Sequence, residues 1–83
     1  MTYRVTFGGG PAAQYHGLPA DAQDFLVARA VELADEPWDA TVLPPADDPS
    51  FREATFGNGV GMLGFHINEG DETLRIFNIV WIG

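Results

Sequence analysis

The chain has 83 residues, is 46% hydrophobic, and carries twelve acidic residues against four arginines and no lysine, for a formal net charge of −8. This length suits one modest hydrophobic core, so we expect a single domain over residues 1–83. The acidic balance argues against binding of free DNA or RNA, because that binding draws its affinity mainly from Lys and Arg. The absence of Cys excludes a disulfide framework, a thiolate zinc site and a cysteine nucleophile.

The start of the chain predicts a strand. Residues Thr2–Phe7 alternate, with Tyr3, Val5 and Phe7 on one face. This segment lacks the charged and apolar regions of a signal peptide, and no apolar run in the chain approaches the roughly 18 residues that a membrane span requires. We therefore expect a cytoplasmic protein without membrane contact.

Two helices are predicted after this strand. Three glycines end the strand, and Pro11 opens a short helix through His16 that Gly17 closes. A longer helix begins at Leu18-Pro19 and ends before Pro37, because the residue before a proline is pushed out of the helical region. Its apolar residues recur at helical spacing: Ala22, Phe25, Leu26, Ala30 and Leu33.

The stretch Trp38–Ser50 is predicted to be an acidic loop. Four prolines, counting the one that ends the long helix, interrupt this region and argue against regular structure.

The last third of the chain predicts three strands in a row: Phe51–Gly57, Val60–Asn68 and Thr73–Ile82. Asn58-Gly59 between the first two is a strong hairpin signal, because both residues tolerate the positive φ of a type I′ turn. Strand, helix pair and meander together predict an α+β fold of order β-α-α-β-β-β. Two helices would pack on one face of a four-stranded, mainly antiparallel sheet.

Alternation assigns the faces of these strands. The residues expected beneath the long helix, against Leu26, Ala30 and Leu33, are Val5, Leu63, Phe65 and Ile67. The opposite row would hold Met62, Gly64 and His66, with Gly61 and Asn78 nearby. On the last strand, which should be central and lie beside the first, one row holds Leu74, Ile76, Val80 and Ile82 and the other holds Phe77, Ile79 and Trp81.

His66 is the best candidate for proton transfer, because imidazole titrates near neutral pH and the strand alternation places it on the outer row. Arg52 and Arg75 on neighbouring strands could join it in a catalytic set, and the competing interpretation is an ordinary exposed histidine. We expect no metal site, because neither His16 nor His66 has a second ligand at a suitable local spacing.

We also expect no nucleotide cofactor. The glycine pattern at 59–64 matches a dinucleotide fingerprint letter by letter but runs from a turn into a strand, whereas that motif must open a helix. The residues predicted to bind a partner on the outer row are Met62, Gly64 and Asn78, with the glycine allowing close approach. Trp81 is either a core residue or an interface anchor.

The chain resembles the RelE/ParE superfamily of small bacterial toxins in the following segments: Tyr3–Phe7, Leu18-Pro19, the helix that ends at Pro37, Phe51-Arg52, and the strands Met62–Asn68 and Leu74–Ile82. The resemblance implies the fold above and an antitoxin that covers apolar surfaces. In ribosome-dependent members it also implies messenger RNA cleavage by basic residues and a tyrosine on the outer face. Arg52 matches that set, whereas the positions expected for arginine, tyrosine and a His-Arg pair hold Met62, Phe65, Trp81 and Ile82.

Two functions follow. The preferred one is a toxin-like binding protein that lacks the usual basic catalytic residues and acts through contact with a protein, in the family's case a cognate antitoxin. The alternative is a ribosome-dependent endoribonuclease toxin that uses His66, Arg52 and Arg75. The sequence leaves both the activity and the oligomeric state open.

Overall fold

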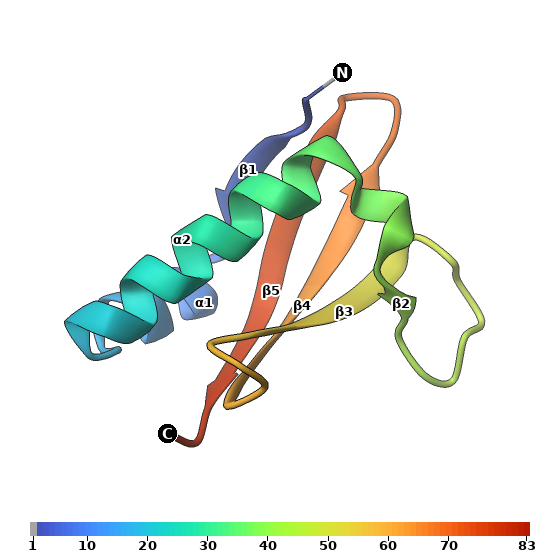
Figure 1. Ribbon diagram of the computed structural model, residues 1–83. Helices are drawn as coiled ribbons and strands as arrows, with labels where there is room; N and C mark the ends of the chain where they lie inside the picture. The colour runs from blue at the N-terminus through green and yellow to red at the C-terminus, as the bar shows by residue number, and fades with distance from the viewer. Residues whose placement is uncertain (1) are drawn as a thin grey trace.

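A five-stranded sheet in the order β1-β5-β4-β3-β2 forms one layer of the fold, and the long helix α2 crosses one of its faces (Figure 1). The computed structural model describes residues 2–83. Its elements are β1 (Arg4–Phe7), α1 (Gly9–His16), α2 (Ala20–Asp35), the 3-10 helix η1 (Pro37–Asp39), β2 (Thr41–Val42), β3 (Phe51–Phe56), β4 (Gly61–Asn68) and β5 (Thr73–Trp81). The strand β1 runs parallel to β5, and all other pairs are antiparallel. The predicted α+β class, the two helices and the central place of the last strand are confirmed.

The prediction of no regular structure over 38–50 is wrong in part. The segment begins within η1, and Thr41 and Val42 then pair with β3 as a fifth strand. These two residues lie in a proline-free stretch, so both can supply the backbone N–H that a sheet ladder needs. Prolines on either side limit this edge strand to two residues.

The hairpin turn forms as predicted. Asn58 and Gly59 have φ values of 60° and 85°, and the backbone N–H of Val60 donates to the carbonyl of Gly57. Strand pairing stops at Phe56 and resumes at Gly61, so both strands are slightly shorter than expected.

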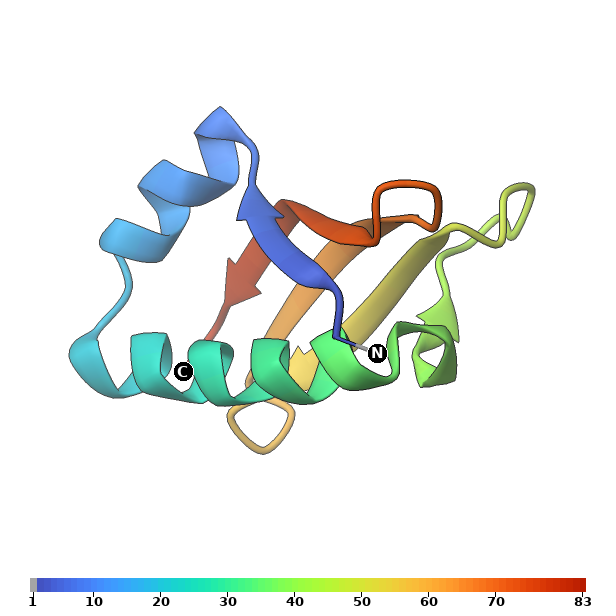
Figure 2. The same ribbon diagram turned by 90° about the horizontal axis from the view of Figure 1, so that it is seen from above.

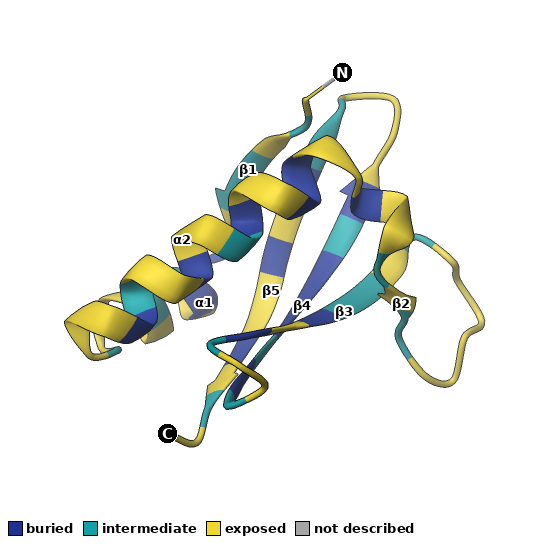
Figure 3. Ribbon diagram, viewed as in Figure 1, coloured by how far each residue is buried: buried dark blue, intermediate teal, exposed yellow. Residues whose placement is uncertain are grey.

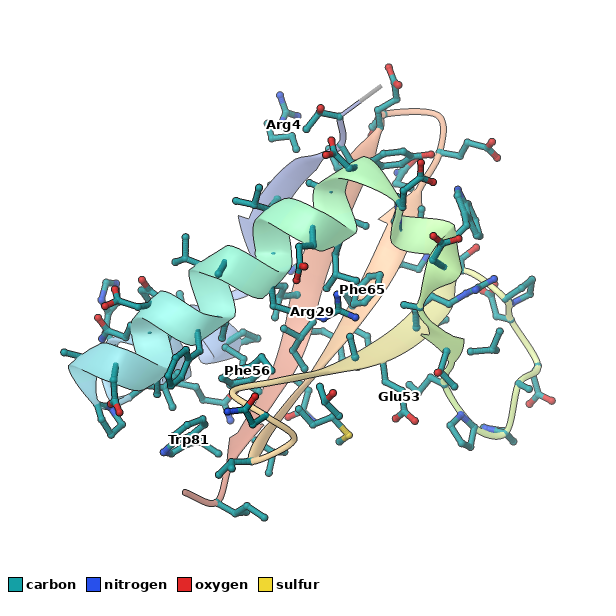
Figure 4. The ribbon with its side chains drawn as sticks, viewed as in Figure 1. Arg4, Arg29, Glu53, Phe56, Phe65 and Trp81 are labelled. Carbon is teal, nitrogen blue, oxygen red and sulfur yellow. The ribbon has the colours of Figure 1, made fainter. Side chains whose placement is uncertain are left out.

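The core lies between α2 and the sheet. Leu26 and Leu33 of α2 pack in one cluster with Leu63, Phe65 and Ile67 of β4, all of them buried. Figure 3 shows the buried stripe on the sheet side of α2, and Figure 4 shows Phe65 between the helix and the strands. The predicted packing of this helix on this row is confirmed.

A β-bulge changes which residues of β5 face the helix. Gly64 pairs with Asn78 while Phe65 pairs with Ile76, so Phe77 is an extra residue on β5. After the bulge the inward residues are Ile79 and Trp81, whereas Val80 and Ile82, which were expected in one row with Leu74 and Ile76, are exposed. The assignment of one continuous row along this strand is therefore wrong, because strict alternation holds only where no residue is inserted.

The short helix α1 covers the edge of β5 where β1 ends (Figure 2). The backbone N–H of Ile79 donates to Oε1 of Gln14 at 3.2 Å. This bond satisfies a sheet donor that has no neighbouring strand at that point. Within residues 2–83, neither helix is long and apolar enough to cross a bilayer.

We expect Leu63→Ala to lower the free energy of unfolding by roughly 2–5 kcal/mol, because it removes a fully buried side chain beneath α2. The neighbouring Met62→Ala on the outer face is the control and should cost less than about 1 kcal/mol. Urea denaturation measures both variants. A loss of stability below about 0.5 kcal/mol for Leu63→Ala would contradict the assigned register.

Gly61→Ala should also destabilise the fold, because a Cβ there would lie 2.5 Å from Cζ of Phe56. We expect a loss of about 1–3 kcal/mol, the usual cost of overpacking. In the Phe56→Leu background the same substitution should cost measurably less, since the shorter side chain leaves room. Equal costs in the two backgrounds would show that the two positions are not in contact.

Candidate functional site

The outer face of the sheet, opposite α2, carries a group of aromatic rings. The Cα register places Phe51 opposite His66, and His66 opposite Arg75. The ring of Phe51 lies 4.7 Å from that of His66 and 5.7 Å from that of Phe77, between centroids. We call Phe51, His66 and Phe77 the outer aromatic cluster.

The structure brings together only two of the three predicted catalytic residues. His66 is half-buried on the outer face and Arg75 is its exposed neighbour on β5. Arg52 lies directly opposite the buried Phe65, which places it on the helix side of the sheet.

Arg52 has a structural role. Its Nη1 donates to the carbonyls of Trp38 and Ala40, and its Nε donates to the carbonyl of Pro49. Its guanidinium carbon lies 5.2 Å from the centroid of the Trp38 ring, at cation–π distance. The side chain thus fastens the 38–50 segment to β3, a contact that the sequence did not reveal because that segment was expected to be irregular.

The predicted binding residues are divided between the two faces. Met62, Gly64 and Asn78 lie on the outer side as expected, but Gly64 is buried because the Phe77 ring covers it: a Cβ there would be 3.0 Å from Cζ of Phe77. Trp81 lies on the helix side, where its ring stacks on Phe56 at 5.6 Å (Figure 4). Gly61 also faces Phe56, so its predicted place on the outer face is wrong.

One position that the family resemblance assigns to the outer face lies in the core of this protein. Phe65, matched to the family's tyrosine, is fully buried between α2 and the sheet. It therefore cannot touch a ligand on the outer face.

A second surface, which was not predicted from the sequence, is a groove between α2 and β1. It has a volume of about 490 Å³. We call it the α2/β1 groove; its lining residues are mostly apolar and include Tyr3, Val5, Phe7, Val27, Ala30 and Val31. The signal for it was Val27 and Val31, which share one face of the helix at i, i+4 outside the stripe that meets the sheet.

The groove runs along a free sheet edge. The backbone N–H groups of Arg4 and Gly8 donate to carbonyls of Glu72 and Ile76, on the β5 side. Backbone groups of successive strand residues point to opposite sides, so those of Val5 and Phe7 point away from β5. Within residues 2–83 they have no backbone partner, which leaves this edge open to another strand.

The four arginines divide into two pairs. Arg52 is held as described, and Nε of Arg29 donates to the carbonyl of Thr55 while its Nη1 lies 3.3 Å from Glu32 Oε1. Arg4 and Arg75 are exposed, and their guanidinium groups have no hydrogen-bond or ion-pair partner among residues 2–83. In the same range, no three His, Asp or Glu side chains come together in a group that could hold a metal ion.

No family model and no curated protein sequence matches this chain. Solved structures do match it. The isolated RelE toxin of E. coli superposes with a TM-score of 0.83 at 13% identity, over 98% of this chain and 85% of that one. The RelBE2 toxin–antitoxin complex of Mycobacterium tuberculosis gives 0.82 at 21% identity, over 98% and 99%.

An archaeal RelE–RelB complex from Pyrococcus horikoshii extends the likeness, with a TM-score of 0.73 at 20% identity over 100% of this chain and 98% of that one. At such identities the agreement concerns the path of the backbone, and it spans nearly the whole chain. The fold that the sequence resemblance implied is confirmed: this protein has the fold of the RelE toxins.

Proposed function

We propose that this chain is a toxin-like protein of RelE fold that acts by holding a segment of a protein partner in the α2/β1 groove. The observation that carries this proposal is the apolar groove beside an open strand edge. An extended segment could add a strand to β1 through the backbone groups of Val5 and Phe7 and place alternate side chains in the groove.

Exposed apolar side chains support a partner at this place. Val31 is 63% exposed, Val27 47% and Phe7 38%, and all three line the groove. Contact of several neighbouring apolar side chains with water is energetically unfavourable, so a contiguous exposed patch of this kind marks an interaction surface. Covering it would remove this apolar area from water.

The charge of the chain favours a basic partner. The net charge is −8, and exposed acidic residues are spread along α2, with Asp35 at one end of the groove. Complementary charge would speed association and select against acidic competitors. The structurally similar proteins of M. tuberculosis and P. horikoshii were solved as toxin–antitoxin and RelE–RelB complexes, which supports a partner of the antitoxin kind here.

The outer face supports binding over catalysis as the main activity. Among residues 2–83, only Arg4 and Arg75 add permanent positive charge to this face, since Arg52 is held on the helix side and Arg29 lies on α2. The alternative endoribonuclease set of His66, Arg52 and Arg75 does not converge on one face of the sheet, which counts against that function.

We expect a photo-crosslinking residue at Val31 to capture a basic protein in the native host. Val31→Glu should weaken binding of that purified protein at least tenfold, because it places a carboxylate in an apolar groove. Val80→Glu introduces the same change at an exposed valine outside the groove and should alter affinity less than twofold. Isothermal titration measures both variants. Loss of binding in Val80→Glu with none in Val31→Glu would contradict the proposal.

The purified protein should show no measurable binding to a generic RNA at physiological salt, because its net charge repels phosphate. Fluorescence anisotropy with a labelled single-stranded RNA measures this. Micromolar affinity that weakens in Arg75→Ala would instead support an RNA-binding outer face, and Arg29→Ala is the matched control on the opposite side of the sheet.

A further inference from the structure

A second cleft lies on the outer face, between the sheet and the loop over residues 43–50. It has a volume of about 340 Å³ and is bordered by loop residues on one side and by Phe51 and Phe77 on the other. The loop contributes Leu43, Pro44, Pro45, Asp47 and Asp48. Figure 2 shows the loop rising on the side of the sheet away from α2, so this cleft is separate from the α2/β1 groove.

The aromatic wall of the cleft is held in place from behind. Phe77 is the extra residue of the β5 bulge, and its ring lies over Gly64 and in a T-shaped contact with the ring of Phe51. The two phenylalanines are nevertheless 37% and 38% exposed. They therefore present ring surface to the cleft without having to rearrange.

The opposite wall brings two carboxylates to the same cleft. Asp48 Oδ1 accepts a hydrogen bond from the backbone N–H of Ser50, which leaves its other oxygen free. The carboxylate of Asp47 has no hydrogen-bond or ion-pair partner among residues 2–83. Aromatic faces and carboxylates attract the same kind of ligand, a cation with some apolar surface.

We infer that this cleft binds an arginine side chain of a protein partner. A guanidinium can stack on an aromatic ring and donate two parallel hydrogen bonds to a carboxylate, whereas a lysine ammonium offers neither a flat face nor a fork. The prolines and Leu43 would contact its aliphatic stem. The chain already contains such a stack, Arg52 on Trp38.

The charges of the surrounding side chains favour a cation in this cleft and disfavour one in the neighbouring hollow. A neighbouring hollow, which the two phenylalanines also line, is bordered by His66 and Arg75, and the Arg75 guanidinium repels a cation there. The cleft therefore has room and charge for one basic side chain. Because it lies on the opposite face from the α2/β1 groove, this inference stands whether or not a partner occupies the groove.

An NMR titration of the ¹⁵N-labelled protein with acetyl-Gly-Arg-Gly-amide tests the inference. We expect a dissociation constant on the order of millimolar, as suits one cation at an exposed site, with the largest shift changes at Asp47, Asp48, Phe51 and Phe77. The same peptide with citrulline, which keeps the shape and loses the charge, should bind at least fivefold more weakly, and the lysine peptide should fall between them. Equal affinity for the citrulline peptide, or shifts confined to α2 and β1, would overturn the inference.

Matched variants separate the cleft from general charge attraction. Asp47→Asn combined with Asp48→Asn should weaken arginine binding at least fivefold, and the asparagine can still accept the Ser50 bond. Asp24→Asn combined with Glu69→Gln removes the same charge at exposed positions elsewhere and should change affinity less than twofold. Equal weakening in both pairs would show nonspecific attraction and refute a site.

A titration with a nucleotide tests whether this face binds a phosphate ligand instead of an arginine side chain. Uridine monophosphate should leave the Phe51 and Phe77 amides unshifted at concentrations that saturate with the arginine peptide. Shifts at these residues with the nucleotide, lost in Arg75→Ala and accompanied by no arginine binding, would show that the face accepts phosphate ligands and that the inference is wrong.

Discussion

Packing of α2 on β4 determines which surfaces of this protein remain free. The helix buries Leu26 and Leu33 in one cluster with Leu63 and Phe65, and all four belong to the hydrophobic core of an 83-residue chain. One long helix can cover only one face of a five-stranded sheet, so the opposite face stays in contact with solvent. The α2/β1 groove lies where the same helix passes β1, the strand at the edge of the sheet. Both candidate surfaces therefore follow from a single helix–sheet contact.

The bulge in β5 connects the two faces. Inserting Phe77 lets Ile79 and Trp81 continue the core after Ile76, and it also places an aromatic ring outside. Gly64 gives that ring room, because a Cβ there would lie only 3.0 Å from Cζ of Phe77. A residue that appears to interrupt the core pattern thus builds part of the outer aromatic cluster.

Two of the four arginines stabilise the fold and are not available to bind a ligand. The backbone follows that of RelE toxins, yet Arg52 binds three carbonyls and stacks on Trp38, and Arg29 binds the carbonyl of Thr55. Basic side chains used in this way stabilise the chain and are not available to phosphate. Proteins of one fold have many different functions. The acidic surface of this chain, and not its backbone fold, is therefore the feature that favours a protein partner.

The features that depend on neighbours along the chain could be predicted from the amino-acid sequence. Helical spacing identified α2, alternation identified the core row of β4, and positive φ at Asn58 and Gly59 was expected from the residue types alone. The structure was needed to find the bulge, β2, the position of Arg52 and the α2/β1 groove. Each of these depends on which strand lies beside which and in what register, and no local pattern encodes that choice because pairing joins residues far apart in sequence.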